Sequence, residues 1–573
     1  MKTADYIPRF LHAQGITHVF ELVGGMTTHL VDSLYRFNQV QVVSMHHEQG
    51  AAFAADAMGR ITGLPAVAMA TSGPGATNLL TGIGSCYFDS SPAVFITGQV
   101  NRDEQKGDRP IRQLGFQETD IVSMAAPITK AAWRVREPED VPALLKDAFV
   151  LAMSGRPGPV LLDIPMDVQR MDIDVAEPTK LAELPSAGID MSEVRAILAA
   201  MGAARRPLIL VGGGLRASRA GSLFRRFVDH LHIPVVNTLL AVDALPYDHP
   251  LRIGMIGSYG NRWANTAIGL SDYVLVLGSR LDVRQTGADV ASFKANRTIY
   301  HVDCDPGEIN NRISGCGYMV ADLGTFLHAA ESLARSTSCP EHHWWVDELS
   351  ELRARWPDTA ELDDIKGINP NVFMHQLSAA SHNAASFVVD VGQHQMWAAQ
   401  SVELTPAQTF ITSAGMGAMG FGLPAAIGTA FSYPGRPIVL IAGDGSFQLN
   451  IQELQTVARN RLAIKMVVIN NQCHGMVRQF QESYFDARYQ STYWGYSAPD
   501  FARVANAYGL EGCTVSDPDA VRGALQWLWR DPEAPCLLQV MVDTFANAYP
   551  KLAFGRPITE MEPFATPLGM EST

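Results

Sequence analysis

Two loops carry oxygen ligands that could hold a divalent cation beside a phosphate group. A Gly-Asp-Gly-Ser segment at 443–446 follows one apolar run, 438–442, and Asn471 follows the next, 465–469. A helix-like stretch lies between the runs, so both should be parallel strands whose carboxyl ends meet at one sheet edge. A carboxylate and an amide oxygen suit Mg²⁺, and the glycines let the backbone approach a diphosphate. Gly-Asp-Gly alone is more often an ordinary turn; the strand context favours the metal site.

Short apolar runs alternate with helix-like stretches along the whole chain. This alternation predicts an α/β fold of three doubly wound parallel-sheet domains. The expected domains are 1–172, 188–335 and 366–548, with a tail at 549–573 that could form part of a lid. The expected connecting stretches are a linker at 175–188 and a surface helix with linker at 341–368. The expected strands are 40–43, 66–70, 93–97, 208–211, 274–277, 298–302, 387–389, 438–442, 465–469 and 536–542.

The composition is that of ordinary globular domains with an acidic surface. The 573 residues are 47% hydrophobic and 18% charged, and the formal net charge is -14. This charge disfavours nucleic acid or an anionic membrane as the main partner. No apolar run is long enough to span a bilayer, and the first residues show no apolar signal core, so we expect neither export nor a membrane span. The seven cysteines lie far apart, which favours a reduced, cytoplasmic location.

Several blocks, spread over nearly the whole chain, resemble the thiamine diphosphate enzymes and in particular their acetolactate (acetohydroxyacid) synthase branch. The Gly-Asp-Gly-Ser and Asn-Asn segments at 443–446 and 470–471 resemble the family's signature. The other blocks are His-Glu-Gln-Gly at 47–50, Ser-Gly-Pro-Gly-Ala-Thr-Asn at 72–78, Phe-Gln-Glu-Thr-Asp at 116–120, Val-Gly-Gln-His-Gln-Met-Trp at 391–397, Gly-Ala-Met-Gly-Phe-Gly-Leu-Pro at 417–424 and Gln-Glu-Leu at 452–454. The resemblance implies the thiamine diphosphate enzyme fold, with pyrimidine-binding, FAD-binding-like and diphosphate-binding domains in that order.

The resemblance also implies a site for thiamine diphosphate and Mg²⁺. The metal ligands would be the side chains of Asp444 and Asn471 and the backbone carbonyl of Cys473. The residues implied in thiamine diphosphate binding are Gly25, Glu48, Pro74, Asn78, Gln393, His394, Gly417, Met419, Gly443, Asp444, Gly445, Ser446, Asn471, Cys473, Gly475 and Met476.

Four residues gain catalytic roles from the resemblance: Glu48, Gln117, Lys130 and Met419. Glu48 would hydrogen-bond the pyrimidine ring of the cofactor and assist proton transfer; by residue type alone it is an ordinary acid in the first turn of a helix. Met419 would be an apolar wedge beneath the cofactor, although methionine by default fills gaps in a core. Gln117 would lie on an active-site loop. Lys130 is equally well explained as a solvated surface charge.

A second cofactor, FAD, is implied by turns in the middle of the chain. Gly-Gly-Gly at 212–214, Gly-Ser-Arg-Leu-Asp at 278–282 and His-Val-Asp-Cys-Asp at 301–305 resemble the family's flavin-binding turns, although a triple glycine by itself is weak support. The flavin of this family is structural and non-redox, because carboligation transfers no net electrons. The implied FAD-binding residues are Phe116, Arg156, Gly212, Gly213, Gly214, Thr238, Leu239, Gly278, Arg280, Asp282, Arg284, Asp303, Cys304 and Asp322.

The implied substrate residues are Arg284, Val477 and Phe480. Arg284 matches an arginine that grips the carboxylate of the acceptor keto acid, and a salt bridge beside the flavin is the alternative. Phe480 stands where the biosynthetic enzymes usually carry a tryptophan that favours 2-ketobutyrate. Met166 replaces a usual lysine, and the loop at 101–114 is longer and more charged than its family counterpart. These departures leave the acceptor open.

Together these features predict an acetolactate synthase-type carboligase that decarboxylates pyruvate and adds the hydroxyethyl unit to a second 2-keto acid, giving acetolactate with pyruvate. A related carboligase with a ketosugar, aldehyde or diketone acceptor is the first alternative. A flavin- or nicotinamide-dependent oxidoreductase and a non-catalytic binding protein are the others. The family builds its site from two subunits, which implies a homodimer or homotetramer, and a small regulatory subunit is a possible further partner.

Overall fold

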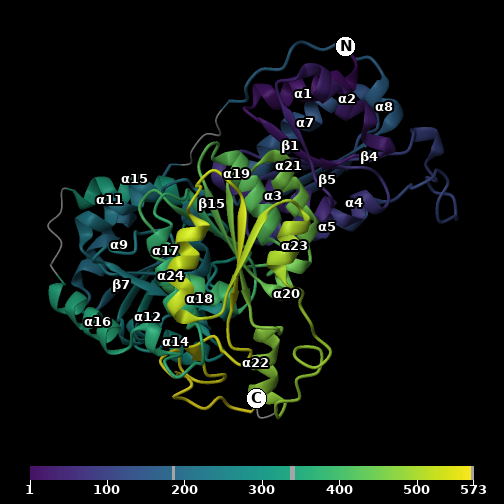
Figure 1. Ribbon diagram of the computed structural model, residues 1–573. Helices are drawn as coiled ribbons and strands as arrows, with labels where there is room; N and C mark the ends of the chain where they lie inside the picture. The colour runs from purple at the N-terminus through teal and green to yellow at the C-terminus, as the bar shows by residue number, and fades with distance from the viewer. Residues whose placement is uncertain (183–187, 336–341, 570–573) are drawn as a thin grey trace.

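The computed structural model describes residues 1–182, 188–335 and 342–569, and these form three α/β domains (Figure 1). Each domain is built on a six-stranded sheet in which all neighbouring strands are parallel, as predicted. Parts of the predicted linkers (183–187 and 341) and of the predicted tail (570–573) lie outside the described residues.

The first sheet runs in the order β2 (Gln41–Ser44), β1 (His18–Leu22), β3 (Ala66–Ala70), β4 (Ala93–Gln99), β6 (Pro159–Pro165) and β5 (Ala131–Arg134). Helices on its two faces belong to different apolar cores, because a parallel sheet is buried on both sides. One core contains residues of α1 (Thr3–Ala13), α2 (Thr28–Phe37) and α7 (Val141–Met153). The other contains residues of α3 (Glu48–Thr62) and α5 (Leu80–Phe88), and it continues into the third domain.

The second sheet runs in the order β12 (Gly317–Val320), β11 (Thr298–Asp303), β10 (Tyr273–Leu277), β7 (Pro207–Val211), β8 (Val235–Asn237) and β9 (Arg252–Met255). On one face pack α9 (Met191–Ala203), α11 (Gly221–Leu231) and α15 (Leu323–Ala334). On the other pack α12 (Arg262–Leu270) and α16 (His343–Arg355).

Helix α16 lies at the surface of the middle domain, as predicted, and only Trp345 and Leu349 of its residues are buried. Trp345 on this helix is fully buried, and its indole N–H donates to the carbonyl of Pro207 at 3.0 Å. The tryptophan therefore anchors α16 to the middle domain, whose core extends past the predicted boundary at 335. The mixture of charge and tryptophan in the sequence did not show which side chains face inward.

The third sheet runs in the order β14 (Thr409–Thr412), β13 (Ser386–Val389), β15 (Ile438–Gly443), β16 (Ile464–Asn470), β18 (Cys536–Met541) and β17 (Glu511–Val515). Helices α19 (Gly422–Ser432), α20 (Asp444–Gln448), α21 (Leu454–Asn460) and α23 (Phe501–Ala507) lie on one face. Helices α17 (Pro370–Ala380), α18 (Gln393–Ser401) and α24 (Val521–Leu528) lie on the other.

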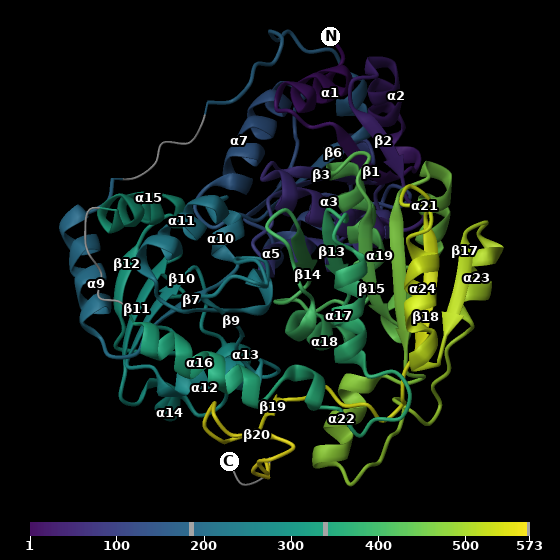
Figure 2. The ribbon, with the colours of Figure 1, turned by 60° about the vertical axis from the view of Figure 1, so that its left-hand side comes forward.

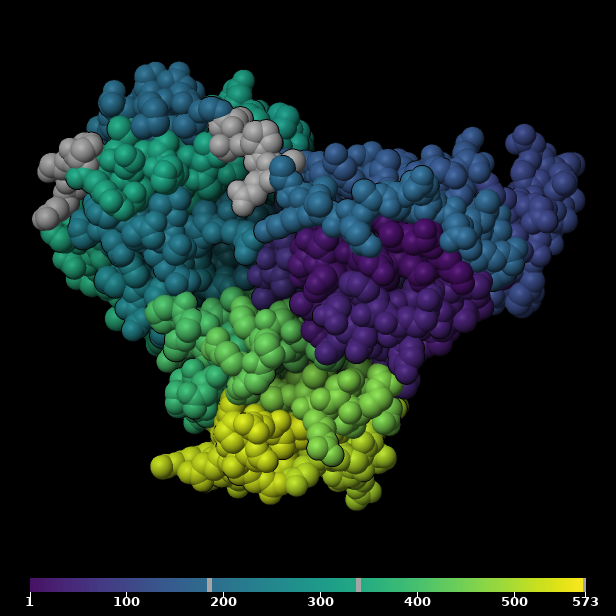
Figure 3. All heavy atoms as spheres, turned by 90° about the horizontal axis from the view of Figure 1, so that it is seen from above, coloured from purple at the N-terminus to yellow at the C-terminus, as the bar shows by residue number. Residues whose placement is uncertain are grey.

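The first and third domains pack through α3 and α19, which lie side by side in both ribbon views (Figure 2). A Cβ on Gly428 would stand 2.0 Å from the carbonyl oxygen of Ala54, so only glycine permits this approach. The backbone N–H of His46 donates to Glu453 at 2.9 Å across the same interface. The purple and green surfaces of these domains meet in Figure 3.

The tail forms a small hairpin against the middle domain. Strands β19 (Lys551–Leu552) and β20 (Met561–Glu562) pair in antiparallel fashion, and a Lys551–Glu562 ion pair of 2.9 Å reinforces them. The N–H of Leu552 donates to the carbonyl of Ser258 at 2.8 Å. This segment is therefore held in place in the structure, and its role as a lid stays a prediction. Within the described ranges, no helix combines the length and apolarity needed to cross a membrane.

Candidate functional site

A cavity of about 370 Å³ opens at the carboxyl ends of β15 and β16, and Asp444 and Asn471 both line it. The two loops therefore converge as the sequence predicts. The Asn471 amide donates to Gln393 Oε1 at 3.1 Å. Its oxygen accepts from the N–H of Cys473 at 3.3 Å and has a second lone pair for a cation. The carboxylate of Asp444 is 3% exposed, and its Oδ2 has no hydrogen-bond partner among the described residues. A buried, unpaired carboxylate oxygen is costly unless a proton or a cation satisfies it.

Burial raises the pKa of Asp444 to about 7 in the absence of a cation. Oxygen ligands of this kind fit Mg²⁺, because that ion binds carboxylate and carbonyl oxygens and keeps positions open for phosphate. The donor set of Asp444 and Asn471, with the carbonyl of the adjacent Cys473, therefore suits the magnesium that the sequence predicts.

At three glycines in the wall of this cavity, neighbouring side chains pack directly against the backbone. A Cβ on Gly443 would lie 2.7 Å from the imidazole of His394, and one on Gly475 would lie 1.8 Å from Gln393 Oε1. A Cβ on Gly445 would lie 2.7 Å from the His474 ring. Side chains could not approach the backbone this closely around any other residue. The cavity therefore has the glycine-lined form that a diphosphate needs.

Most of the residues predicted to bind thiamine diphosphate meet at this cavity, but those of the first domain do not. Its lining is drawn from residues 391–492. Gly25, Glu48, Pro74, Asn78 and Gln117 are not among its lining residues, and Gly417 lines a neighbouring cavity. The predicted residues that do line it are Gln393, His394, Met419, Gly443, Asp444, Gly445, Ser446, Asn471, Cys473, Gly475, Met476 and Val477.

Glu48 lies at the start of α3, as predicted, and is 6% exposed. The side-chain amide of Asn78 donates to Glu48 Oε2 at 3.0 Å. A Cβ on Gly75 would lie 3.1 Å from Glu48 Oε1, so the glycine of the Pro-Gly turn keeps the space next to this oxygen open. Gln117 adopts a positive φ of 65° and packs against Gly73 of the same turn. The first domain thus groups Glu48 and Gln117 around one turn.

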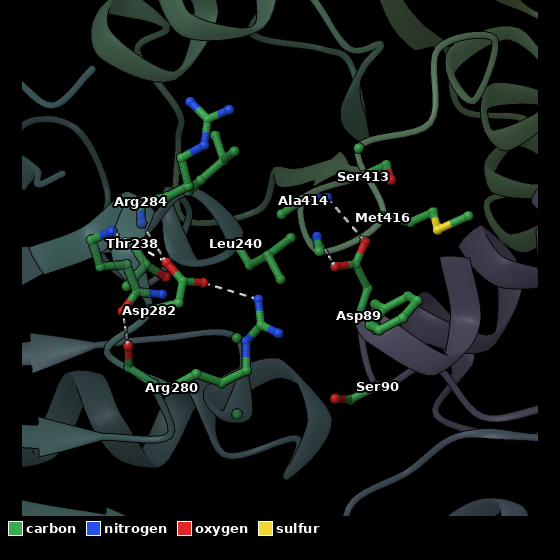
Figure 4. Close-up of a pocket in the computed structure, with 18 of the residues that line it drawn as sticks. Asp89, Ser90, Thr238, Leu240, Arg280, Asp282, Arg284, Ser413, Ala414 and Met416 are labelled. Atoms are coloured by element: carbon green, nitrogen blue, oxygen red, sulfur yellow. Dashed lines mark hydrogen bonds and ion pairs between the residues drawn. The ribbon is translucent and has the colours of Figure 1, made fainter. Parts of the chain in front are cut away.

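A larger cavity, of about 580 Å³, lies where the three domains meet, and Figure 4 shows part of it. It holds most of the predicted FAD-binding residues. Arg280 and Asp282 form an ion pair of 2.9 Å in its wall. The predicted residues that line it are Arg156, Gly213, Gly214, Thr238, Leu239, Gly278, Arg280, Asp282, Arg284, Asp303 and Cys304.

Three predicted FAD-binding residues lie outside this lining. Gly212 packs the turn after β7 against that after β10, since a Cβ there would stand 2.3 Å from the carbonyl oxygen of Gly278. Asp322 caps α15 by accepting from the N–H of Thr325 at 2.9 Å. Phe116 is 79% exposed on the first domain. Gly212 and Asp322 therefore stabilise the fold of the middle domain. Phe116 projects outward from the first domain of the same chain.

Lys130 has a structural environment that neither reading of the sequence anticipated. Its ammonium group donates to the carbonyls of Ser154 at 2.5 Å and Arg156 at 2.9 Å, and burial lowers the pKa of Lys130 to about 8. It is half-buried, not a solvated surface charge, and it lines neither cavity. The lysine holds the loop from which Arg156 reaches the acids Glu308 and Asp305, at 2.5 and 3.3 Å.

Two aspartates that the sequence did not single out position the turn that carries Met419. Asp390 accepts from the N–H groups of Gly420 and Gly422 at 3.0 and 2.9 Å. Asp89 accepts from those of Ala414 and Gly415 at 3.0 and 2.6 Å (Figure 4). Asp390 follows a predicted strand and could have been found by that position. Asp89 comes from another domain, and no spacing signal marks it.

The predicted substrate residues are dispersed. Arg284, on α13 (Val283–Thr286), is among the residues that line the larger cavity (Figure 4) and has no ion-pair partner in the described chain. Val477, on α22 (Gly475–Tyr484), is 53% exposed and lines the smaller cavity. Phe480, on the same helix, packs against Tyr484 and Phe485 and lines neither cavity. Only Arg284 has a free charge for a carboxylate.

Comparisons with known proteins match all three domains. Family models for the thiamine pyrophosphate enzymes match residues 1–124 (N-terminal TPP binding domain), 194–330 (central domain) and 390–540 (C-terminal TPP binding domain). The acetolactate synthase isozyme 2 large subunit of Escherichia coli (strain K12) is 37% identical, over 98% of this chain and 99% of that protein. The acetolactate synthase of Arthrospira platensis is 37% identical, over 96% of this chain and 96% of that protein. The acetolactate synthase large subunit of Pyropia yezoensis is 36% identical, over 96% of this chain and 94% of that protein.

Proposed function

Because the chain belongs to the acetolactate synthase branch of the thiamine pyrophosphate enzymes, we propose that it decarboxylates pyruvate and joins the remaining two-carbon unit to a second 2-keto acid. With pyruvate as acceptor, the product is acetolactate. The observation that carries this proposal is the buried, unpaired carboxylate oxygen of Asp444 beside Asn471, in a glycine-lined cavity at a sheet edge. A reaction mixture of purified protein, pyruvate, Mg²⁺ and thiamine diphosphate, assayed for acetolactate, tests it.

The two cavities suit the two cofactors that the family implies. Thiamine diphosphate, when bound, supplies a carbon nucleophile that can store the electron pair released as carbon dioxide leaves. Asp444, Asn471 and the Cys473 carbonyl would hold Mg²⁺ against its diphosphate. The larger cavity would hold FAD in a structural role, with Arg156 and Arg280 near its phosphates.

The protein's own contribution is to position groups and to move one proton. Glu48 would exchange a proton with the pyrimidine ring through Oε1, while Asn78 holds Oε2. Met419, on a turn fixed by Asp390 and Asp89, would keep the cofactor bent. Arg284 would bind the carboxylate of the acceptor, because a guanidinium matches a carboxylate in two contacts.

We further propose a homodimer or homotetramer in which Glu48 of one copy faces the Asp444 cavity of the next. Two observations support this arrangement. The lining of the Asp444 cavity contains no residue of the first domain, although the proposed chemistry needs Glu48. Phe116, beside Gln117, is 79% exposed in one chain, so its ring is available for contact with a second copy. Two of the relatives are named large subunits, so a separate small regulatory subunit is proposed as well.

Phe480→Trp is expected to raise the ratio of acetohydroxybutyrate to acetolactate by up to roughly tenfold when pyruvate and 2-ketobutyrate compete. Phe480 lines neither cavity within one chain, so this expectation rests on the family resemblance, which places a tryptophan that favours 2-ketobutyrate at its position. There an indole would offer more contact area than a phenyl ring to the extra methylene of 2-ketobutyrate, and one methylene contributes about 1–3 kcal/mol in an apolar pocket. Product ratios measured by mass spectrometry test this, with Tyr35→Trp, at an 81% exposed site, as the control. A wild type that already prefers 2-ketobutyrate strongly would contradict the prediction.

Arg284→Ala is expected to lower kcat/KM for acetolactate formation by about tenfold or more, because the acceptor loses the partner of its carboxylate. Initial rates at varied pyruvate concentration measure the effect. Arg195→Ala, at an exposed position of α9, should leave the rates unchanged. Unaltered kinetics in Arg284→Ala would remove this residue from the acceptor site and favour an acceptor without a carboxylate.

A further inference from the structure

A separate cavity, of about 410 Å³, lies between the middle and third domains, away from both cavities already described. Arg252 and Arg353 face it, and we call it the arginine pocket; its other walls include Tyr247, Trp263, Leu349 and Glu403. Arg252 opens the edge strand β9, and Arg353 lies on the last turn of α16. The N–H of Tyr247 donates to the carbonyl of Leu404 at 2.9 Å and thereby ties the two domains together at this point.

Both guanidinium groups lack a carboxylate partner among the described residues. Arg252 is 5% exposed, and its side chain makes no ion pair or hydrogen bond in the structure; its guanidinium lies 5.1 Å from the centre of the Tyr247 ring. The guanidinium of Arg353 lies 4.7 Å from the same ring centre and 5.8 Å from that of Trp263. The aromatic rings thus hold two like charges near one another. Burial, and then the charge of Arg353, lower the pKa of Arg252 to about 10, so the Arg252 guanidinium is still charged at neutral pH.

The acids and histidines around the pocket already have partners or face water. Glu403 accepts from His375 at 2.7 Å, and His375 also contacts Asp358 at 2.9 Å. His249 pairs with Asp229 at 3.0 Å. Asp248 is exposed at the rim. Within the described chain, no carboxylate of the lining forms an ion pair with Arg252 or Arg353, and a buried or half-buried cation without an ion-pair partner is costly unless an anion joins it.

We propose that the arginine pocket binds a small organic anion, whose carboxylate or phosphate group pairs with Arg252 and Arg353 and whose apolar part contacts Leu349 and the neighbouring ring of Trp263. The paired N–H donors of a guanidinium match the oxygens of either a carboxylate or a phosphate. Two arginines around one anionic group would also fix the orientation of that group. The size of the cavity and its aromatic and aliphatic walls are typical of a ligand site. This site is separate from the proposed chemistry, and binding at it can be measured without any turnover.

The test uses the full-length enzyme with thiamine diphosphate and Mg²⁺, titrated in a calorimeter with benzoate and, separately, with phenyl phosphate. The two probes distinguish a carboxylate ligand from a phosphate ligand. We expect saturable binding of at least one probe, and we expect Arg353→Gln to weaken it by about tenfold or more through loss of a charged hydrogen-bond donor. Arg252→Gln should act in the same direction.

The matched control is Arg355→Gln, two positions further on α16, where the side chain is exposed. This variant should bind the probe like the wild type. Because Arg353 is outside the proposed active site, Arg353→Gln should also keep the turnover measured without the probe, which shows that it folds. Failure of both probes to bind the wild type, or equal binding by wild type and Arg353→Gln, would overturn the proposal.

Discussion

Asp444→Ala is expected to weaken magnesium-dependent binding of thiamine diphosphate by at least about 100-fold, which corresponds to roughly 3 kcal/mol. The carboxylate is the only charged ligand proposed for the metal, and without it the cation loses its main bridge between protein and diphosphate. Its burial strengthens the effect, since water cannot easily replace it at a site where Asp444 is 3% exposed. Titration of cofactor against the quenching of protein fluorescence, with and without Mg²⁺, measures the change.

The control for this variant is Asp519→Ala, an exposed aspartate of the same domain, which should bind cofactor normally. The Asp444→Ala protein should remain folded, because the substitution removes a buried carboxylate whose Oδ2 has no partner in the described chain and whose burial is costly. Unchanged cofactor affinity in Asp444→Ala would remove the basis for the metal site.

Glu48→Gln is expected to keep the fold and the affinity for cofactor but to lower kcat by roughly 100-fold or more, as is typical when a general acid–base group is lost. Glutamine preserves the size of the side chain, and its amide oxygen can still accept from Asn78, so the packing of the turn should persist. A glutamine at position 48, however, cannot exchange a proton as the Oε1 atom of the glutamate can. Steady-state rates, together with cofactor titration, separate the two effects.

Glu139→Gln, an exposed change in the same domain, serves as the control and should show normal turnover. If Glu48→Gln lost cofactor binding and kcat together, the glutamate would be a binding residue. Near-normal turnover with full cofactor binding would exclude Glu48 from proton transfer.

The sequence predicted several buried strands well and missed others, for reasons that differ from strand to strand. The all-apolar run of β3 was predicted with its exact bounds, Ala66–Ala70. Strand β17 was missed because only one of its five residues is buried, and β8 because it has three residues. Strand β6 was missed although all its residues are buried, since a proline stands at each end and proline usually marks a break.

Predictions for the site succeeded where one loop follows one strand, as for Asp444 and Asn471, because parallel strands dictate where such loops meet. The sequence did not reveal contacts between residues far apart in the chain. Lys130 was read as either catalytic or solvated, yet it holds the Arg156 loop through backbone carbonyls that no side-chain pattern reveals. The surface helix at 343–355 was predicted, but the sequence did not show that Trp345 is the side chain by which it packs on the middle domain. The arginine pocket likewise joins residues far apart in the chain.

The most direct test of the central claim is product analysis with pyruvate as the sole substrate. Purified protein is incubated with pyruvate, Mg²⁺ and thiamine diphosphate, and the products are identified by mass spectrometry against an Asp444→Ala control. We predict acetolactate as the main product, formed with release of one carbon dioxide for each acetolactate and absent when Mg²⁺ or thiamine diphosphate is withheld. Acetaldehyde without acetolactate, or consumption of pyruvate that does not require thiamine diphosphate, would contradict the account.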